Sequence, residues 1–431
     1  MTAPNAVLLA NARLADGRLV DVSISDGTIT AVIPTANGGG RPDTRTATAE
    51  AEAAVIEHDL GGWLLLPALA EPHAHLDKAL TADLVPNPTG DLMGAIDAWV
   101  TAAGQGRITP EGITERAAKA LELLLVRGVT AVRTHVNVTA DNGVTALVAV
   151  QEAAARFDGL LDVQTVALTS SPMAGPDGAD NRAALTAALE AGVDLVGGCP
   201  HLDPDGPGLI ANAIRVATEA GIGIDLHTDE MLDPTVLTLR DYAEQVIEAG
   251  FDGPVAASHC VTLGMQTPEV QAEVAGRVAE AGIAVFPLPQ TNLFLQGRDH
   301  PTGTPRGLTA VAALREAGAL VAAGGDNVQD PFNLVGRSDP LETAALMVMA
   351  GHQLPDDAYD LVSNDVRLAI GLEPVTIEPG SPADLLAIDA GSVREAIADA
   401  PMSRRVFHRG TLVASADQSA TVHRPADRSG G

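Results

Sequence analysis

The sequence predicts an α/β fold in which a (β/α)8 TIM barrel carries a small β-sandwich domain formed by both chain ends. Three observations predict it. The middle of the chain alternates short apolar runs with helical patterns, and eight such runs occur. This alternation is typical of a parallel sheet, and eight units favour a closed barrel over an open sheet. Both chain ends instead consist of short apolar runs separated by turn residues.

The two chain ends, residues 1–63 and 374–431, are expected to pack together as the small β domain. Near the start, apolar runs at 19–24 and 29–33 flank Asp26-Gly27. An Asp-Gly pair in that position is typical of a β-hairpin. Near the other end, the run Leu385–Ile388 follows a turn at 380–384. Residues 35–53 are rich in Gly, Ala, Thr and Glu and are expected to form a loop.

Residues 64–373 are expected to form the barrel. Its strands are predicted at Leu64–Ala70, Val129–Val138, Val163–Thr169, Val193–Gly198, Ile222–His227, Val255–His259, Ile283–Leu288 and Leu320–Ala323. Helices between them are predicted at 142–156, 181–191, 208–220, 236–250, 268–281 and 308–317. The clearest helix begins after the N-cap Thr109, has Pro110 in its first turn and stops at Gly128.

Charge and cysteine content restrict the classes of partner. The chain has 26 Lys and Arg against 56 Asp and Glu, a formal net charge of −30. This argues against binding to nucleic acid or to an anionic membrane. The two cysteines, Cys199 and Cys260, lie far apart in apolar segments, which fits a reducing cytoplasm better than a disulfide framework. No secretory signal and no apolar run of ~18 residues is visible, so we expect a cytoplasmic protein.

Histidines and acids recur where the predicted strands end. His73 and His75 follow the first strand, and alternation of side chains along a strand points both to one face. Taken alone, this pair could equally be two surface histidines on a loop. However, six of the 11 histidines lie at predicted strand ends: His73, His75, His135, His201, His227 and His259. In a barrel these ends form the active site, so the recurrence favours a metal site.

Together these motifs resemble the amidohydrolase superfamily and, within it, the cytosine deaminase-like branch. The resemblance covers essentially the whole barrel and includes the flanking β domain. It is carried by Glu-Pro-His-Ala-His-Leu-Asp-Lys at 71–78, Val-Arg-Thr-His-Val at 132–136, His-Thr-Asp-Glu at 227–230, Ala-Ser-His at 257–259, Leu-Gln-Gly-Arg at 295–298 and Asp-Asn-Val-Gln-Asp-Pro-Phe at 326–332.

The resemblance implies one divalent metal ion per chain, Fe²⁺ or Zn²⁺, held by His73, His75, His227 and Asp326. Imidazole and carboxylate ligands suit either ion. No lysine follows the third or fourth predicted strand, where a carboxylated bridge between two metals would lie. A mononuclear site is therefore expected. Such an ion would lower the pKa of a bound water toward ~7.

The resemblance also implies three catalytic residues. Asp326 would accept the proton of the attacking water, and His259 would orient that water. Glu230 would carry a proton to the ring nitrogen beside the attacked carbon. Loss of ammonia would complete the hydrolytic deamination of an amino-substituted N-heterocycle.

Three expected pocket residues depart from the cytosine deaminase pattern. Ser170 stands where those enzymes have a glutamine, Asn327 where they have a second aspartate, and Phe332 where they have a tryptophan. Each hydrogen bond lost at a buried polar ring edge costs about 1–3 kcal/mol, so we expect a substrate other than cytosine. His201 completes the expected substrate-binding set, although support of its own loop is an equal alternative.

Other readings stay open at this stage. The same site could remove an N-alkyl amine from a triazine-like ring or open a cyclic amide. A non-catalytic metal-binding barrel is a third alternative. The roles of His135, Gln296 and Arg298 are undetermined, and Asp77 and Lys78 are interpreted as a local ion pair. Because barrels of this family are often oligomeric, a homo-oligomer is expected from the resemblance alone.

Overall fold

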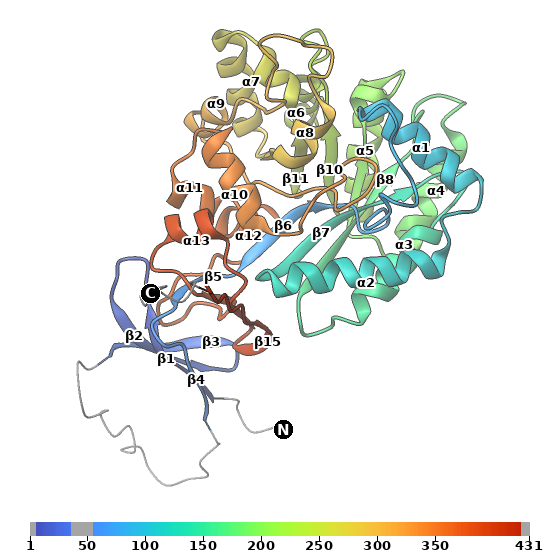
Figure 1. The fold of residues 1–431 in the computed structure, drawn as a ribbon. Coiled ribbons are helices and arrows are strands. Elements are labelled where there is room, and N and C mark those ends of the chain that lie inside the picture. Colours follow the sequence, from blue (N-terminus) through green and yellow to red (C-terminus); the bar gives the residue numbers. More distant parts are fainter. Residues whose placement is uncertain (1–5, 36–54, 424–431) are drawn as a thin grey trace, which may run out of the picture.

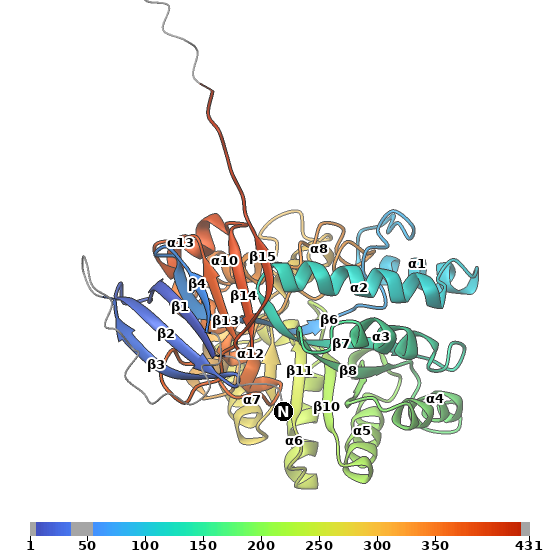
Figure 2. The same ribbon diagram turned by 90° about the horizontal axis from the view of Figure 1, so that it is seen from below.

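The computed structural model describes residues 6–35 and 55–423, which form two sheets and their flanking helices (Figure 1). A mixed sheet is built from both ends of the described chain, and a parallel sheet forms a barrel beside it (Figure 2). The predicted barrel with a β domain from the two chain ends is therefore confirmed. The loop expected at 35–53 lies, apart from Thr35, outside the described residues.

The mixed sheet has the strand order β15-β14-β13-β5-β1-β2-β3, with β4 beside β1. Its strands are β1 Ala6–Arg13, β2 Leu19–Ser25, β3 Thr28–Pro34, β4 Ile56–Asp59, β5 Leu64–Pro67, β13 Leu385–Ile388, β14 Arg404–His408 and β15 Thr411–Ala416. The hairpin predicted at Asp26-Gly27 joins β2 and β3, and both turn residues have positive φ, 50° and 76°. A hairpin turn of this kind requires that conformation, which glycine adopts without strain.

The parallel sheet has the order β12-β11-β10-β9-β8-β7-β6. Its strands are β6 Leu69–Ala74, β7 Val129–Val138, β8 Asp162–Thr169, β9 Leu195–Gly198, β10 Gly223–Thr228, β11 Val255–His259 and β12 Ala284–Phe286. The first predicted strand, Leu64–Ala70, is in fact divided between the two sheets. The division falls at Ala68, whose N–H donates to Asp384 of the small sheet, whereas the N–H of Leu69 donates to Gly128 of the barrel.

The eighth barrel strand, predicted at Leu320–Ala323, is reduced to single bridges in the described residues. Val321 pairs with Val285 and Asp326 pairs with Ala74, and these two bridges nearly close the barrel. A longer ladder does not form because the segment bonds elsewhere. The N–H of Ala323 donates to Leu361 O, and that of Gly325 donates to the Glu71 carboxylate.

Helices surround the two sheets (Figure 1). They are α1 Leu92–Gly104, α2 Pro110–Val126, α3 Thr145–Ala155, α4 Ala179–Glu190, α5 Gly206–Ala220, α6 Thr238–Ala249, α7 Pro268–Glu280, α8 Pro289–Leu295, α9 Val311–Glu316, α10 Pro340–Met349, α11 Pro355–Asp360, α12 Asn364–Ala369 and α13 Val393–Asp399. The six helices predicted between strands are present, with ends within three residues. The Thr109 cap of α2 is confirmed, because its hydroxyl accepts from the N–H of Gly112. Helix α1 was not predicted.

The floor of the barrel is apolar and made largely of small side chains. Ala70, Ala131, Ala256, Ala284 and Ala322 form this layer together with bulkier residues such as Phe286. Two positions after Ala131 and Ala256, β7 and β11 carry the buried polar side chains of Arg133 and Ser258. In residues 6–35 and 55–423, no helix has both the length and the apolar character needed to cross a bilayer.

Candidate metal centre and catalytic pocket

Three histidine rings converge at the carboxyl end of the barrel strands. His73 belongs to β6, His75 follows it directly, and His227 belongs to β10. The Nε2 atoms of these three residues lie 3.1–3.3 Å from one another. Asp326, which bridges to Ala74 at the barrel closure, brings its Oδ1 to 3.3 Å from His75 Nε2 and 3.7 Å from His73 Nε2. All four side chains are buried.

These four residues fit a divalent metal ion. Ligand atoms of a tetrahedral zinc site with bonds of ~2.0–2.1 Å lie roughly 3.3 Å apart, which is the spacing of the Nε2 atoms. Among the described residues, neither carboxylate oxygen of Asp326 has a hydrogen-bond partner. Burial is the largest cause that lowers the pKa of His73, His75 and His227 well below the usual range, so their lone pairs are available to a metal. A bound cation would stabilise this arrangement, in which a buried carboxyl group without a hydrogen-bond partner faces three neutral imidazoles.

The chain turns sharply where three of the strands end. Asp229, His259 and Asp326 all have positive φ, at 52°, 66° and 63°. Residues with side chains adopt this region rarely and at an energetic cost, and such residues cluster at functional sites. At Asp229 the turn is held by its own carboxylate, which accepts from the backbone of Thr238 and Leu239 at the start of α6.

Glu230 and His259 face each other beside the histidine cluster. His259 Nε2 lies 3.6 Å from Glu230 Oε2, and His259 Nδ1 lies 3.0 Å from Asn292 Oδ1. Because an amide oxygen only accepts, Nδ1 carries the ring proton and Nε2 is left bare. Burial raises the pKa of Glu230 to about 8 and lowers the pKa of His259 to about 3. At neutral pH the pair therefore consists of a protonated carboxyl group and a neutral imidazole.

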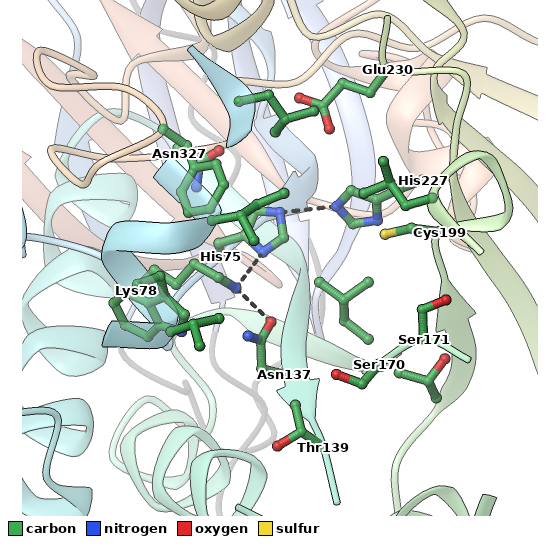
Figure 3. Close-up of a pocket in the computed structure, with 18 of the residues that line it drawn as sticks. His75, Lys78, Asn137, Thr139, Ser170, Ser171, Cys199, His227, Glu230 and Asn327 are labelled. Atoms are coloured by element: carbon green, nitrogen blue, oxygen red, sulfur yellow. Dashed lines mark hydrogen bonds between the residues drawn. The ribbon is translucent and has the colours of Figure 1, made fainter. Parts of the chain in front are cut away.

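A cavity of about 260 Å³ opens beside these groups (Figure 3). It is lined by His75, Lys78, Leu92, Ile96, Trp99, Val100, Asn137, Thr139, Leu168, Thr169, Ser170, Ser171, Cys199, Leu202, His227, Glu230, His259, Asp326, Asn327 and Phe332. Three of the four residues expected to bind substrate, Ser170, Asn327 and Phe332, thus lie at the cavity. The fourth, His201, places its Nδ1 3.1 Å from the backbone oxygen of His227. This contact ties the loop that carries His201 to the end of β10, which fits the alternative in which His201 supports its own loop.

A sequence model described as the amidohydrolase family matches residues 103–414, which is more than half of the chain. The chain belongs to the amidohydrolase family. The resemblance noted in the sequence is thereby confirmed, and the chain is a hydrolase that acts on C–N bonds.

Full-length relatives place this amidohydrolase near deaminases. It is 32% identical over 439 aligned residues to a pterin deaminase from Rhizobium rhizogenes, covering 99% of this chain and 98% of the relative. The 5-methylcytosine deaminase from Klebsiella pneumoniae has a similar structure, with a TM-score of 0.82, 28% identity and coverage of 97% and 99%. So does the N-isopropylammelide isopropylaminohydrolase from Burkholderia multivorans, with a TM-score of 0.79, 26% identity and coverage of 95% and 98%. The cytosine deaminase-like branch inferred from the sequence is therefore confirmed.

One wall of the amidohydrolase cavity comes from α1, which the sequence analysis missed. Leu92, Ile96, Trp99 and Val100 of this helix all line the cavity. The available signal was Trp99, one of only two tryptophans in the chain, placed within the apolar stretch 92–103 that follows the loop after the metal-binding motif. This wall is apolar, so it favours a flat, uncharged part of a ligand.

Lys78 also lines the cavity. Its Nζ lies 3.2 Å from both carboxylate oxygens of Asp77, in agreement with the expected ion pair, and 2.8 Å from Asn137 Oδ1. The same Nζ lies 5.7 Å from the centre of the Trp99 ring. Lys78 therefore joins the polar side of the cavity to the α1 wall.

Two further residues of undetermined role lie near the mouth. Gln296 donates from Nε2 to the backbone oxygen of Glu230 at 3.0 Å, so it supports the segment that carries the acid. The guanidinium of Arg298 lies 4.8 Å from the centre of the Phe294 ring and donates to the backbone oxygen of the same residue. In these positions Gln296 is linked to the site, whereas Arg298 lies in the turn after α8 and packs on Phe294 of that helix.

Proposed function

We propose that this amidohydrolase deaminates an amino-substituted fused N-heterocycle of the pterin class by hydrolysis. The observation that carries the proposal is the placement of Glu230 and His259 beside the histidine cluster, at one end of a cavity with an apolar wall. Full-length similarity to a pterin deaminase supports the choice of ring. The product would be the corresponding oxo heterocycle, with ammonia as the second product.

The metal in this proposal is a single Zn²⁺ or Fe²⁺ held by His73, His75, His227 and Asp326. The three imidazoles and one carboxylate suit either ion. When bound, such an ion lowers the pKa of a water molecule toward ~7 and so supplies a nucleophile at neutral pH. Burial keeps the three histidines neutral, which is the form in which imidazole binds a metal ion.

Glu230, His259 and Asp326 would then move the protons. Asp326 accepts the proton that the attacking water gives up, and His259 accepts a hydrogen bond at its bare Nε2 and so orients that water. Glu230, protonated at neutral pH because burial raises its pKa to about 8, donates to the ring nitrogen beside the attacked carbon. The C=N bond becomes a single bond as the new C–O bond forms.

The second half of the reaction returns the protons. A proton passes to the amino group, the C–NH₂ bond breaks and ammonia leaves as the carbonyl forms. Asp326, which holds the proton taken from the water, can deliver this proton, and Glu230, deprotonated in the first half, can accept the proton of the new hydroxyl group as the carbonyl forms. The overall change is one water consumed and one ammonia released.

The walls of the cavity support a fused ring rather than cytosine. We propose that Ser170, Asn327 and Phe332 contact the substrate. Ser170 is shorter than the glutamine expected for a cytosine deaminase and leaves room for a larger ring. The apolar residues of α1 would cover the second ring, and burial of that ring surface contributes about 25 cal/mol per Å².

The proposal is tested by measuring ammonia release from pterins, aminopyrimidines, aminotriazines and creatinine, with zinc- and iron-loaded protein. We expect ammonia from the pterins and a loss of at least ~100-fold in kcat for the Glu230→Gln variant. Glu248→Gln, which neutralises an exposed carboxylate on α6, is the matched control and should retain activity. No ammonia from any pterin, or equal activity in the two variants, would contradict the proposal.

A second candidate is removal of an N-alkyl amine from a triazine-like ring. The structural similarity to the N-isopropylammelide isopropylaminohydrolase favours it. The same assay distinguishes it, because an alkylamine and not ammonia would be released. Metal binding with no amine released from any ring would instead point to a non-catalytic barrel.

The remaining expectations about the whole protein also stand as proposals. The net charge of −30 supports a protein that binds neither nucleic acid nor anionic membrane, and the two cysteines far apart in the sequence support a place in the reducing cytoplasm. A homo-oligomer is proposed from the family resemblance, and light scattering of the purified chain would measure its mass.

A further inference from the structure

A row of buried polar side chains lies in the barrel directly behind His73. Ser258 Oγ lies 2.7 Å from His73 Nδ1, whereas the other ring nitrogen, Nε2, is the one that faces His75 and His227. The same hydroxyl lies 3.2 Å from Asp225 Oδ1. Arg133 Nη1 lies 3.0 Å from Asp225 Oδ2. Each of these four side chains is at most 2% exposed.

The strand pattern explains why these residues meet. Arg133 precedes His135 by two positions on β7, and Asp225 precedes His227 by two positions on β10, so each pair points into the barrel. The register of β10 and β11 places Ser258 opposite His227. Beneath the row is the alanine floor, which offers no hydrogen-bond partner.

Arg133, at the end of the row that is farthest from His73, is also held by hydrogen bonds. Arg133 donates from Nε and Nη2 to Gln164 Oε1 at 3.1 and 3.0 Å, and Gln164 donates to the backbone oxygen of Ile370. Within residues 6–35 and 55–423, the guanidinium thus has one charged partner, Asp225. A buried carboxylate paired with arginine is favoured in its ionised form, which only accepts hydrogen bonds.

The direction of each hydrogen bond then follows from the number of protons. Asp225 accepts, so the single proton of the Ser258 hydroxyl points to Asp225. The Ser258 oxygen must then accept from His73, which places the ring proton of His73 on Nδ1. A neutral imidazole has only one such proton, so Nε2 is bare. That bare atom is the one that faces His75 and His227.

We propose that Ser258, Asp225 and Arg133 are positioning residues that set the tautomer of His73 and so make its Nε2 a metal ligand. The inference rests on the metal centre of the proposed function but not on the identity of the substrate. Without the row, the His73 proton could move to Nε2, where it would point at the neighbouring imidazoles and block coordination. Partners of this kind orient and tune a ligand without touching the metal.

The tautomer can be read directly in the full-length chain. Long-range ¹H–¹⁵N spectra of histidine-labelled, metal-free protein distinguish a protonated Nδ1 from a protonated Nε2, and a His73→Gln variant assigns the signals by their loss. The inference predicts a proton on Nδ1 of His73 in the wild-type protein. A proton on Nε2 overturns it, whatever the variants below show.

The hydroxyl of Ser258 is tested by a matched pair of variants. Ser258→Thr and Ser258→Val introduce side chains of the same branched shape, and the valine has a methyl group in place of the hydroxyl that the threonine keeps, so comparison of the two separates hydrogen bonding from the effect of the added branch. Competition with a zinc chelator measures the metal dissociation constant of each. We expect Ser258→Val to bind zinc ~10–100-fold more weakly than Ser258→Thr, the range typical of lost partners of metal ligands. Equal affinities of the two variants overturn the inference.

Asp225→Asn supplies a second measurement if the matched pair does not fold. This variant keeps the shape of the side chain but removes the charge that fixes the direction of the hydrogen bonds from His73 through Ser258. The Nδ1–H tautomer of His73 should then no longer dominate, and the affinity for zinc should fall. An unchanged tautomer and affinity overturn the inference. The outcome is separable from the proposed function. If the variants change the His73 tautomer and the zinc affinity but the protein deaminates no pterin, only the proposed function is contradicted. If the protein deaminates a pterin but the variants change neither, only this inference is contradicted.

Discussion

Burial decides the protonation states of the residues that would do the chemistry. Glu230 is buried beside neutral histidines, and its pKa rises to about 8. His259 is buried against Asn292, and its pKa falls to about 3. The site therefore holds an acid and a neutral hydrogen-bond acceptor side by side at neutral pH.

The first prediction concerns the pH dependence of activity. Because the proposed proton donor is the acid form of Glu230, kcat/KM should fall as pH rises through about 8. Below that pH Glu230 keeps its proton, so its titration should leave kcat/KM unchanged. Steady-state rates from pH 6 to 10 with a pterin substrate provide the measurement. The residual kcat/KM of the Glu230→Gln variant should not fall as pH rises through about 8. A fall in that variant would show that another group titrates.

The residues of the site differ in how well the sequence could predict them. His73 and His75 could be placed on one face because strand side chains alternate, and the structure brings both to the cluster. Arg133 and Asp225 share that period with His135 and His227, yet their role was missed. Charged side chains in a strand interior indicate function only when their partners are known, and those partners lie 92 residues apart in the chain.

Helices and strands were predictable where a local pattern fixes them. Strands β7 and β11 were predicted with their observed bounds, and α2 begins at the predicted cap. The eighth barrel strand was overestimated because hydrogen bonds to Leu361 and to the Glu71 carboxylate replace its ladder. Such tertiary partners are invisible in a local pattern. Helix α1 was missed for a related reason, since its apolar residues face a ligand cavity as well as a core.

The second prediction concerns α1. Trp99 packs with Val85 and Ala102, lines the cavity and carries the largest side chain of the α1 wall. Replacing Trp99 with Ala should raise KM for a fused-ring substrate about tenfold, which corresponds to about 1.4 kcal/mol of lost binding. The change in kcat should be smaller, because the acid and the metal ligands lie on other elements.

Steady-state kinetics of two variants test the role of α1. Met93 lies on the same helix, is exposed and does not line the cavity. Met93→Ala should leave KM unchanged. If Trp99→Ala and Met93→Ala changed KM equally, the α1 wall would not be a substrate contact.

At the scale of the whole molecule, buried ion pairs and hydrogen bonds join the barrel to the sheet formed by the two chain ends. Asp384 holds this junction beside β13. Its carboxylate accepts from Arg367 Nη2 at 2.9 Å and from the backbone N–H of Arg409 at 2.8 Å, and it lies 2.9 Å from His408 Nδ1. Arg404 of β14 adds a second link through its ion pair with Asp339, the N-cap of α10.

The domain bounds expected from the sequence, 1–63, 64–373 and 374–431, stay a prediction. The hydrogen bonds change sheet at Ala68, four residues after the expected boundary at Leu64. Both ends of the chain were nevertheless correctly assigned to one sheet, because each shows the same pattern of short runs and turns. Their pairing through β5 and β13 could not be derived, since no local signal specifies a contact between strands that the whole barrel separates in the sequence.

The third prediction concerns acid stability at this junction. Burial alone would raise the pKa of Asp384, but the hydrogen bond to His408, the charge of Arg367 and the N–H of Arg409 outweigh burial and lower the pKa to about 2. A lowered carboxyl pKa stabilises the fold above the unfolded-state pKa, and that contribution is lost as pH falls through the folded-state value. Between pH 4 and 2 the wild-type protein should therefore lose about 2 kcal/mol through this group.

Denaturant unfolding of Asp384→Asn at each pH measures this contribution. The variant should be less stable than wild type at pH 7, and the difference should shrink toward pH 2. Asp389→Asn, an exposed neighbour on the same segment, is the control and should follow the wild-type curve. A difference that is constant across this pH range would assign the effect to packing and not to charge.

The central claim is that one metal ion, held by three histidines and Asp326, enables the chain to deaminate a pterin. Titration of metal-free protein with Zn²⁺ or Fe²⁺, with ammonia release from pterin as the readout, tests it most directly. The account predicts negligible ammonia without metal and activity that rises linearly to a plateau at one ion per chain. Ammonia release that survives complete metal removal, or a protein that binds one ion and releases none, would contradict it.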